Sequence, residues 1–362
     1  MGQPGQTLRI WKGRFINTET ATEGVTSKSL RRTIMSKLNL EGGLRGMAMA
    51  LCLAGPLGTT GAIAQTYPER PITMVVPFNA GGAADATGRI LAEGMSRHLE
   101  QNVLVENVGG AGGAIGTARV ANAEPTGYTI GLGHMGTLAA AVAINPSLQY
   151  DPRKDFKYLG LVSSSPNVIY VGKDFPPQTL QEFIAYAKSD KGAPGMGHGG
   201  IGAASHVACV MLFKLIDVKP NLIAYKGFGQ TITDVLGGRI DGGCDLLASA
   251  APQAKSGNIR VLAIAAKERS PILPDAPTSI EAGLPEFQTE TWTGLFVPKD
   301  TPDDVSAKLQ HAIAKTLQED DVRKRLEAIG ATLPANDHRS SDYMKTLVSQ
   351  EVSNWSKILK PN

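Results

Sequence analysis

The stretch VVPFNAGGAADATGR, residues 75–89, decides the fold of this chain. The apolar run Ile72–Val76 before it predicts a buried strand, and a proline ends that run. Gly81 and Gly82 then permit a tight turn, after which Asp85 opens an amphipathic helix. The turn contains no Lys, Ser, Cys or His. The turn could present backbone N–H groups to an anion, but taken alone it is better interpreted as a simple turn with Asp85 as the helix cap.

The order strand, glycine loop, helix recurs along the chain. Three glycine loops follow predicted strands, at 79–84, 109–116 and 197–204. Further strands are predicted at 102–107, 127–133, 167–172, 259–266 and 291–298. Such alternation is typical of parallel α/β sheets with helices on both faces, and ligands bind such sheets beyond the carboxyl ends of the strands. The fold class is therefore α/β, and the three loops mark the expected site.

The length of 362 residues favours two lobes over one domain. We expect the first lobe to comprise residues 65–166 plus 290–362, and the second residues 167–289. Each lobe should be a mostly parallel sheet flanked by helices.

Residues 1–64 predict an N-terminal extension and an export signal. Lys37 and Arg45 precede an apolar stretch, GMAMALCLAG, that is too short for a membrane span, and Ala62–Ala64 fits a cleavage site. A start at Met35 and a twin-arginine route through Arg31 and its neighbour stay open. This segment contains eight of the 36 Lys and Arg residues but only three of the 33 Asp and Glu residues. The net charge of +3 therefore comes from the predicted export segment, and it gives no argument for nucleic-acid binding.

Cys209 and Cys244 are the two cysteines beyond the signal. An oxidising compartment would permit a disulfide between them, and two buried thiols are the alternative. No metal site is expected, because the chain has no CxxC pair or His/Cys cluster with zinc spacing.

No catalytic or dinucleotide motif fits its required context. In GGAGGAIG, Ile115 stands where a dinucleotide loop needs its third glycine, and the GxGxxG at Gly195–Gly200 begins directly after KSDKGAP, which is not a strand pattern. GxSxG is absent, and the histidines in or near the loops, His134, His198 and His206, lack a recognisable catalytic partner. These observations favour a binding protein over an enzyme.

Eight motifs, read in order, resemble the substrate-binding proteins of tripartite tricarboxylate transporters, the Bug family. They run from Tyr67 to the C-terminal part: YPERPITMVVPFNAGGAADATGR, VENVGGAGGAIGT, GYTI, AYAKS, GIGAASH, YKG followed by TDVLGGRID, LAIAAKERSPILPDAPTSIEAGLPEF, and WTGLFVP. The resemblance implies a periplasmic, type II-like "Venus flytrap" protein whose two lobes close around a small carboxylate. It also implies membrane transporter subunits as partners, no cofactor, and a monomer.

The resemblance also implies ligand-binding positions. In the first and third loops and after the strand GYTIGLG these are Phe78, Asn79, Gly81, Gly82, Asp85, Thr137, His198, Gly200, Gly202, Ala203 and Ser205. Ala203 stands where the family usually has a hydroxyl residue, and His198 stands where Ser is common. We therefore expect His198 to donate to a ligand carboxylate or to stack on an aromatic acid.

Two other functions stay open at this stage. One is a ligand sensor that presents its closed form to a membrane signalling protein. The other is an enzyme on the same scaffold, with His198 or His206 as the base. The sequence does not name the ligand.

Overall fold

The computed structural model describes residues 67–190 and 192–359. The predicted export signal and its cleavage site lie outside these residues. Within the described ranges no helix is both long enough and apolar enough to cross a bilayer.

One half of the β-structure is built on the strand that the opening motif predicts. β1 (Ile72–Val76) pairs in parallel with β2 (Val103–Asn107) and with β3 (Thr129–His134). β9 (Glu290–Pro298) runs antiparallel to β3 and joins it to the next strand, β4. Four of these five strands thus share a direction and β9 alone is reversed, as expected for a mostly parallel sheet.

The other half repeats this arrangement. β5 (Gly195–His198) pairs in parallel with β6 (Asn221–Ala224) and β7 (Gly242–Leu246). β4 runs antiparallel to β7 and to β8 (Ile259–Ile264). Here the reversed strand is β4. The strand order is β2-β1-β3-β9-β4-β7-β5-β6, with β8 beside β4.

β4 (Phe156–Gly172) is the long strand that belongs to both halves. Its residues 156–166 pair with β9, and its residues 167–172 pair with β7 and β8. Asn167, where the partners change, is fully buried, and its side-chain amide donates to Thr289 and Thr291. These bonds connect β4 to the chain entering β9.

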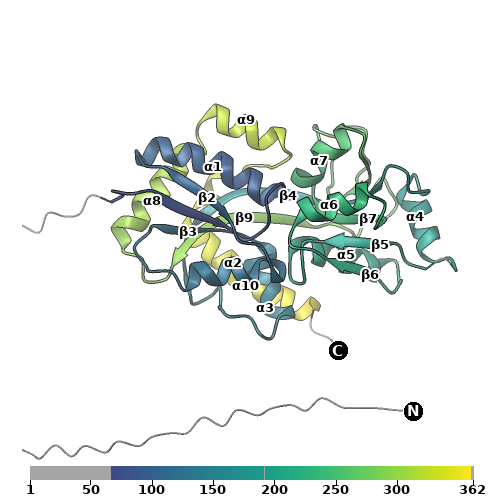
Figure 1. The fold of residues 1–362 in the computed structure, drawn as a ribbon, viewed down its shortest axis with the longest axis horizontal. Helices are drawn as coiled ribbons and strands as arrows, with labels where there is room; N and C mark the ends of the chain where they lie inside the picture. Colours follow the sequence, from purple (N-terminus) through teal and green to yellow (C-terminus); the bar gives the residue numbers. More distant parts are fainter. Residues whose placement is uncertain (1–66, 191, 360–362) are drawn as a thin grey trace, which may run out of the picture. The chain divides into compact units, whose positions relative to one another are not determined.

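Helices cover both faces of each half (Figure 1). Around β1–β3, one face carries α1 (Ala83–Leu99), α8 (Asp303–Thr316) and α9 (Asp320–Ala328), and the other carries α2 (Ala114–Ala121), α3 (Ala141–Ile144) and α10 (Ser341–Leu359). Around β5–β7, α6 (Phe228–Leu236) and α7 (Leu247–Lys255) cover one face, and α4 (Leu180–Ala187) and α5 (Ala204–Leu215) cover the other. Short helical turns complete the chain, η1 (Ala111–Gly113), η2 (Gly136–Ala140) and η3 (Asn336–Arg339).

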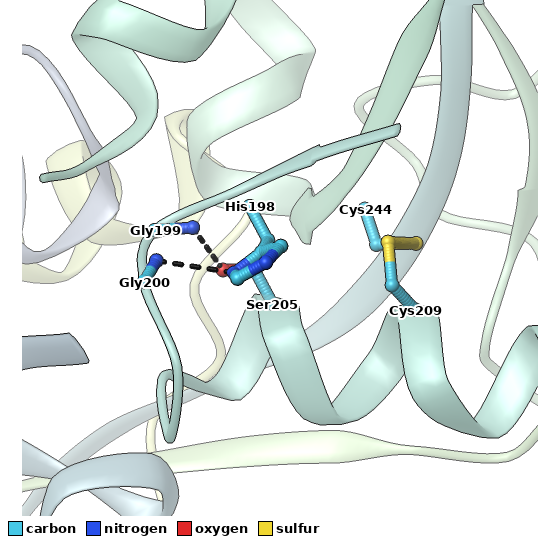
Figure 2. Close-up of a disulfide and its surroundings, with 6 residues drawn as sticks. All are labelled: His198, Gly199, Gly200, Ser205, Cys209 and Cys244. Atoms are coloured by element: carbon cyan, nitrogen blue, oxygen red, sulfur yellow. Dashed lines mark hydrogen bonds between the residues drawn. A yellow bond between two sulfur atoms is a disulfide. The ribbon is translucent and has the colours of Figure 1, made fainter. Parts of the chain in front are cut away.

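A disulfide joins Cys209 of α5 to Cys244 of β7, with 5.5 Å between their Cα atoms (Figure 2). The question that the sequence left open is therefore resolved in favour of a bridge. The bond fixes the middle of α5 against the middle of β7.

Candidate ligand-binding site

A small cavity of about 40 Å³ lies beyond the carboxyl ends of β1, β3, β5 and β7. Its walls come from loops on both halves of the β-structure. The lining residues are Phe78, Asn79, Gly82, Ala83, Ala84, His134, Gly199, Ala203, Ala204, Ser205, Gly227, Phe228, Asp245, Leu246 and Ser249. The cavity thus occupies the edge of the sheet where open α/β folds bind ligands.

Four helices begin at this cavity. The N-cap residues of α1, α5, α6 and α7 all belong to the lining: they are Gly82, Ala203, Gly227 and Leu246. None of the four N-cap side chains makes a capping hydrogen bond. Because the N-terminal N–H groups of a helix carry a partial positive charge, their convergence creates a site that favours an anion.

The lining contains no Lys or Arg in the part of the chain that the structure describes. Helix N-termini are therefore the main source of positive potential at the cavity. The described residues also contain no group of three or more His, Cys, Asp or Glu side chains placed to hold a metal ion.

The first glycine loop is fixed by its own acidic residue. The backbone N–H of Gly81 donates to Asp85 Oδ2 at 3.0 Å, and Asp85 also pairs with Arg89 at 2.9 Å. Burial acts to raise the pKa of Asp85, but the hydrogen bonds from Arg89 and Gly81 hold it below its usual range. Asp85 does not line the cavity, and its contacts shape the turn that presents Gly82.

Two hydrogen bonds connect this loop to the opposite wall. The N–H of Asn79 donates to the carbonyl of Lys226 at 3.1 Å, and the N–H of Ala83 donates to Ser249 Oγ at 2.9 Å. Ser249 belongs to α7, so α1 and α7 meet at their N-termini.

The third glycine loop begins later than the sequence motif does. Gly195–His198 forms β5, and the loop starts at Gly199, whose N–H donates to Ser205 Oγ at 2.9 Å. The N–H of Gly200 donates to His198 Nδ1 at 3.2 Å, so that nitrogen is an acceptor and Nε2 carries the proton (Figure 2). Burial, together with the neighbouring His206 ring at 4.7 Å, lowers the pKa of His198 to about 4.

Among the described residues, His134 is the one histidine that lines the cavity. Its ring stacks on Phe78 with 5.0 Å between ring centroids, and its Nδ1 accepts the N–H of Gly136 at 2.9 Å. Burial lowers the pKa of His134 to about 4. The imidazole is therefore neutral near pH 7, with its proton on Nε2.

The structure separates the eleven predicted ligand-binding residues into two groups. Those that line the cavity are Phe78, Asn79, Gly82, Ala203 and Ser205. Those that do not are Gly81, Asp85, Thr137, His198, Gly200 and Gly202. Thr137 is fully buried, and its hydroxyl bonds to the backbone of His134. The ligand contact proposed for His198 stays a prediction.

The sequence reasoning missed the wall that follows β6 and β7. Gly227, Phe228, Asp245 and Ser249 lie there, and none was named as a site residue. A signal was present, because GGCDL forms the strand β7 and the helix α7 follows it directly. The rule that selected the three glycine loops applies equally to this position.

A sequence model of the family described as "Tripartite tricarboxylate transporter family receptor" matches residues 87–362. The chain belongs to this family. Its members are receptors of transporters, so the protein is a binding protein and not an enzyme.

Solved structures of relatives share the whole fold. MatC (Rpa3494) from Rhodopseudomonas palustris, with bound malate, is 39% identical at a TM-score of 0.78, covering 81% of this chain and 100% of its own. The periplasmic binding protein BugD is 37% identical at a TM-score of 0.77, covering 81% and 97%. The fold is therefore the α/β fold of periplasmic binding proteins, and the resemblance to the Bug family is confirmed.

Two further relatives are equally distant in sequence but differ in structural similarity. Rpa4515 of R. palustris, with adipate, is 29% identical at a TM-score of 0.76, covering 81% of this chain and 97% of its own. A solute-binding protein of the family from Polaromonas, with no ligand, is also 29% identical, covering 81% and 99%, but has a TM-score of 0.56.

Proposed function

We propose that this receptor captures a small carboxylate in the cavity and delivers it to the membrane subunits of a tripartite tricarboxylate transporter. The observation that carries the proposal is the convergence of four helix N-termini on one small cavity whose lining includes no Lys or Arg. Such an arrangement stabilises a carboxylate through backbone N–H groups alone.

The energies favour an anion without requiring a cation. One helix N-terminus contributes about 0.3–1 kcal/mol to a nearby negative charge, and up to about 2 kcal/mol where the geometry is partly buried. Hydrogen bonds to a charged carboxylate are stronger than those between neutral groups. The malate of MatC and the adipate of Rpa4515 are both carboxylates, which supports the same class of ligand here.

We place the two lobes at residues 65–166 plus 290–362 and at residues 167–289. β4 changes its partners between Pro166 and Asn167, which supports a boundary there. The natural hinge is β4, the strand that both halves share, together with the chain entering β9, where the second lobe returns to the first.

We infer that the described structure is the closed form. It is more similar to the adipate complex than to the ligand-free Polaromonas protein, although both relatives are equally identical in sequence. The hydrogen bonds Asn79–Lys226 and Ala83–Ser249 support this, because they join the two proposed lobes across the cavity. The protein acts as a monomer in the periplasm, after export removes residues 1–64.

Ligand-induced stabilisation tests the proposal. The protein from residue 65 onward is heated with mono-, di- and tricarboxylates, aromatic acids and the corresponding amides. A true ligand present at about 100 times its Kd raises the free energy of unfolding by about 2.7 kcal/mol. The matched amide should give no shift, because it lacks the charge that the helix N-termini stabilise.

The emission of Trp292 on β9 reports closure in the same titration, with Trp292→Phe as the control. If no carboxylate stabilised the protein, or if amides did so equally well, carboxylate capture would be wrong.

A further inference from the structure

The second glycine loop, residues 109–116, does not belong to the cavity. The sequence marked it as one of three loops at the expected site, and the first and third of these do contribute to the lining. None of the residues 109–116, all of which the structure describes, is part of that lining. The glycines of this loop therefore need another explanation.

The centre of this loop faces the second proposed lobe. A Cβ atom added at Gly112 would collide with the carbonyl oxygen of Ile201 and would lie 3.0 Å from the backbone nitrogen of Ala203. From the opposite side, a Cβ atom added at Gly200 would lie 2.6 Å from the backbone nitrogen of Gly112. The second and third glycine loops therefore meet backbone to backbone, and the contact leaves no room for a side chain.

A second contact of the same kind lies at the start of the loop. A Cβ atom added at Gly109 would lie 3.0 Å from the carbonyl oxygen of Lys226. The same carbonyl oxygen accepts the N–H of Asn79 at 3.1 Å. Gly109 and Asn79 belong to the first proposed lobe and Lys226 to the second, so the second glycine loop contacts the other lobe at two places.

The backbone conformation of the loop does not by itself require glycine at position 112. The φ angle is +48° at Ala111 and +65° at Gly112, so both residues are left-handed. Ala111 shows that the loop accepts an alanine in this conformation, which most residues other than glycine avoid. What excludes a side chain at position 112 is thus the approach of Ile201 from the other lobe.

We propose that residues 109–113 form a closure latch, a loop of the first lobe that packs against the third glycine loop only when the two lobes close. This inference rests on the closed form inferred above and adds a determinant of affinity that lies outside the cavity. Because the apparent Kd equals the intrinsic Kd divided by the binding-competent fraction, a weaker latch lowers the affinity for every ligand by the same factor.

Gly112→Ala and Gly238→Ala form a matched pair of variants. The φ angles of the two glycines are +65° and +66°, so an alanine is in nearly the same left-handed conformation at both positions. A Cβ atom at Gly238 would meet nothing within 4 Å, whereas one at Gly112 would meet the other lobe. Gly112→Ala should therefore hinder closure, and Gly238→Ala should not.

Cross-linking measures closure without any ligand. Ala111 and Lys226 lie on opposite proposed lobes and line one outer groove. In the protein from residue 65 onward, the pair Ala111→Cys and Lys226→Cys can be joined by a short bismaleimide when the lobes are closed. Cys209 and Cys244 are bonded to each other, so they do not compete for the reagent.

Gly112→Ala, added to this cysteine pair, should slow cross-linking about tenfold or more, because it lowers the closed fraction. Gly238→Ala should leave the rate unchanged. Urea unfolding of the ligand-free variants should show similar losses for both, since an open protein has room for the added methyl group. Equal cross-linking rates would overturn the latch. Failure of Gly112→Ala alone to fold would also overturn it, because the glycine would then be required within its own lobe.

Malate and adipate, the ligands of MatC and Rpa4515, serve as probes in titration calorimetry. Gly112→Ala should weaken the binding of each probe that the wild type binds, by the factor that slows cross-linking. Unchanged affinity beside slowed cross-linking would overturn the role of the latch in binding. If no carboxylate of any kind binds the wild type, the proposed function fails, while the cross-linking rates still decide whether the latch exists.

Discussion

Two groups of helices in this molecule begin in different ways. α4, α8, α9 and α10 begin away from the cavity lining, and each has acidic residues in its first turn, namely Glu182, Asp303 and Asp304, Asp320 and Asp321, and Asp342. α5, α6 and α7 begin at the cavity and have no acidic residue in the first turn, although Asp245 directly precedes the N-cap residue of α7. α1 has Asp85, which is engaged with Gly81 and Arg89.

The difference in first-turn acidic residues shows how the positive potential of helix N-termini can be kept available for a ligand. A negatively charged side chain in the first turn offsets the partial positive charge of the helix N-terminus. Where that side chain is missing, the partial charge remains for whatever enters the cavity. The binding site is thus defined as much by the acids that are absent from three helices as by the groups that are present.

Ala84→Asp should place an acidic side chain in the first turn of a cavity helix and give the largest loss of carboxylate affinity. Ala84 lines the cavity in the first turn of α1. Two carboxylates about 4 Å apart repel by about 4 kcal/mol at an effective dielectric constant of about 20. Carboxylate affinity, measured by calorimetry, should therefore fall about a thousandfold. Ala84→Asn has the same size without the charge, and equal affinities for the two variants would contradict the expectation.

Removing the disulfide tests how much this bond between a cavity helix and β7 contributes to the free energy of unfolding. Cys209 and Cys244 are 35 residues apart, and α5 is the cavity helix that this bond ties to β7. The double variant Cys209→Ala and Cys244→Ala should lose about 2–4 kcal/mol of unfolding free energy, because the unfolded chain regains its freedom. Urea unfolding measures the loss. Reductant should lower the midpoint of the wild type but not that of the variant, and a wild-type midpoint that reductant leaves unchanged would speak against this role.

The pH dependence of stability tests whether the cavity region holds neutral histidines. The pKa values of His134 and His198 are lowered to about 4 by burial, whereas an unfolded histidine titrates near 6.5. Between pH 6.5 and pH 5 the unfolded chain takes up protons that the folded protein does not. Stability is therefore present above pH 6.5 and is lost as the pH falls, by about 2 kcal/mol for each ring at pH 5.

Imidazole titration by NMR measures this directly in the folded protein. Neither ring should protonate above pH 5. Protonation near pH 6.5 would show that the site contains a cation under mildly acidic conditions, and that helix N-termini are not its main positive groups.

Ser249→Ala tests the contribution of one hydrogen bond in the cavity wall to ligand affinity. The Ser249 hydroxyl accepts the N–H of Ala83, so the variant leaves one N-terminal donor of α1 without its acceptor. This bond joins the two proposed lobes in the closed form and contributes about 0.5–1.5 kcal/mol, so its loss should weaken closure and lower ligand affinity about two- to tenfold. Ser256→Ala, at the other end of α7, is the control. Equal losses in the two variants would mean that the Ala83–Ser249 bond has no special part in binding.

Asp304→Asn addresses an exposed helix and should give the smallest effect. Asp304 lies in the first turn of α8, far in sequence from the cavity residues. Loss of its charge should lower the free energy of unfolding by about 0.3–1 kcal/mol, measured by urea unfolding. Ligand affinity should not change. A change in affinity would show that the two groups of helices are not independent.

Much of the fold could be predicted from local patterns. The apolar run Ile72–Val76 and the helix after it were predicted from periodicity, and both form where expected. The first part of β4, residues 156–166, was not predicted. It contains three consecutive serines and Pro166, which weaken a strand signal, and its pairing with β9 is what holds it.

The candidate site was predictable only in part. Phe78, Asn79, Gly82, Ala203 and Ser205 lie in loops that glycine patterns mark. Asp245 lies in β7 and Ser249 follows it in α7, with no glycine loop between the two elements, so only the order of strand and helix marked their position and no glycine pattern did.

The sequence by itself determined which segments become strands and helices, because the spacing of apolar residues and the glycine turns are local properties of the chain. It also determined the family, through motifs in a fixed order. Only the tertiary structure decided that four helices begin at one cavity and that Ser249 lies beside Ala83, 166 residues earlier. Such contacts depend on strand order and on how the two halves meet. No spacing along the sequence records either of these.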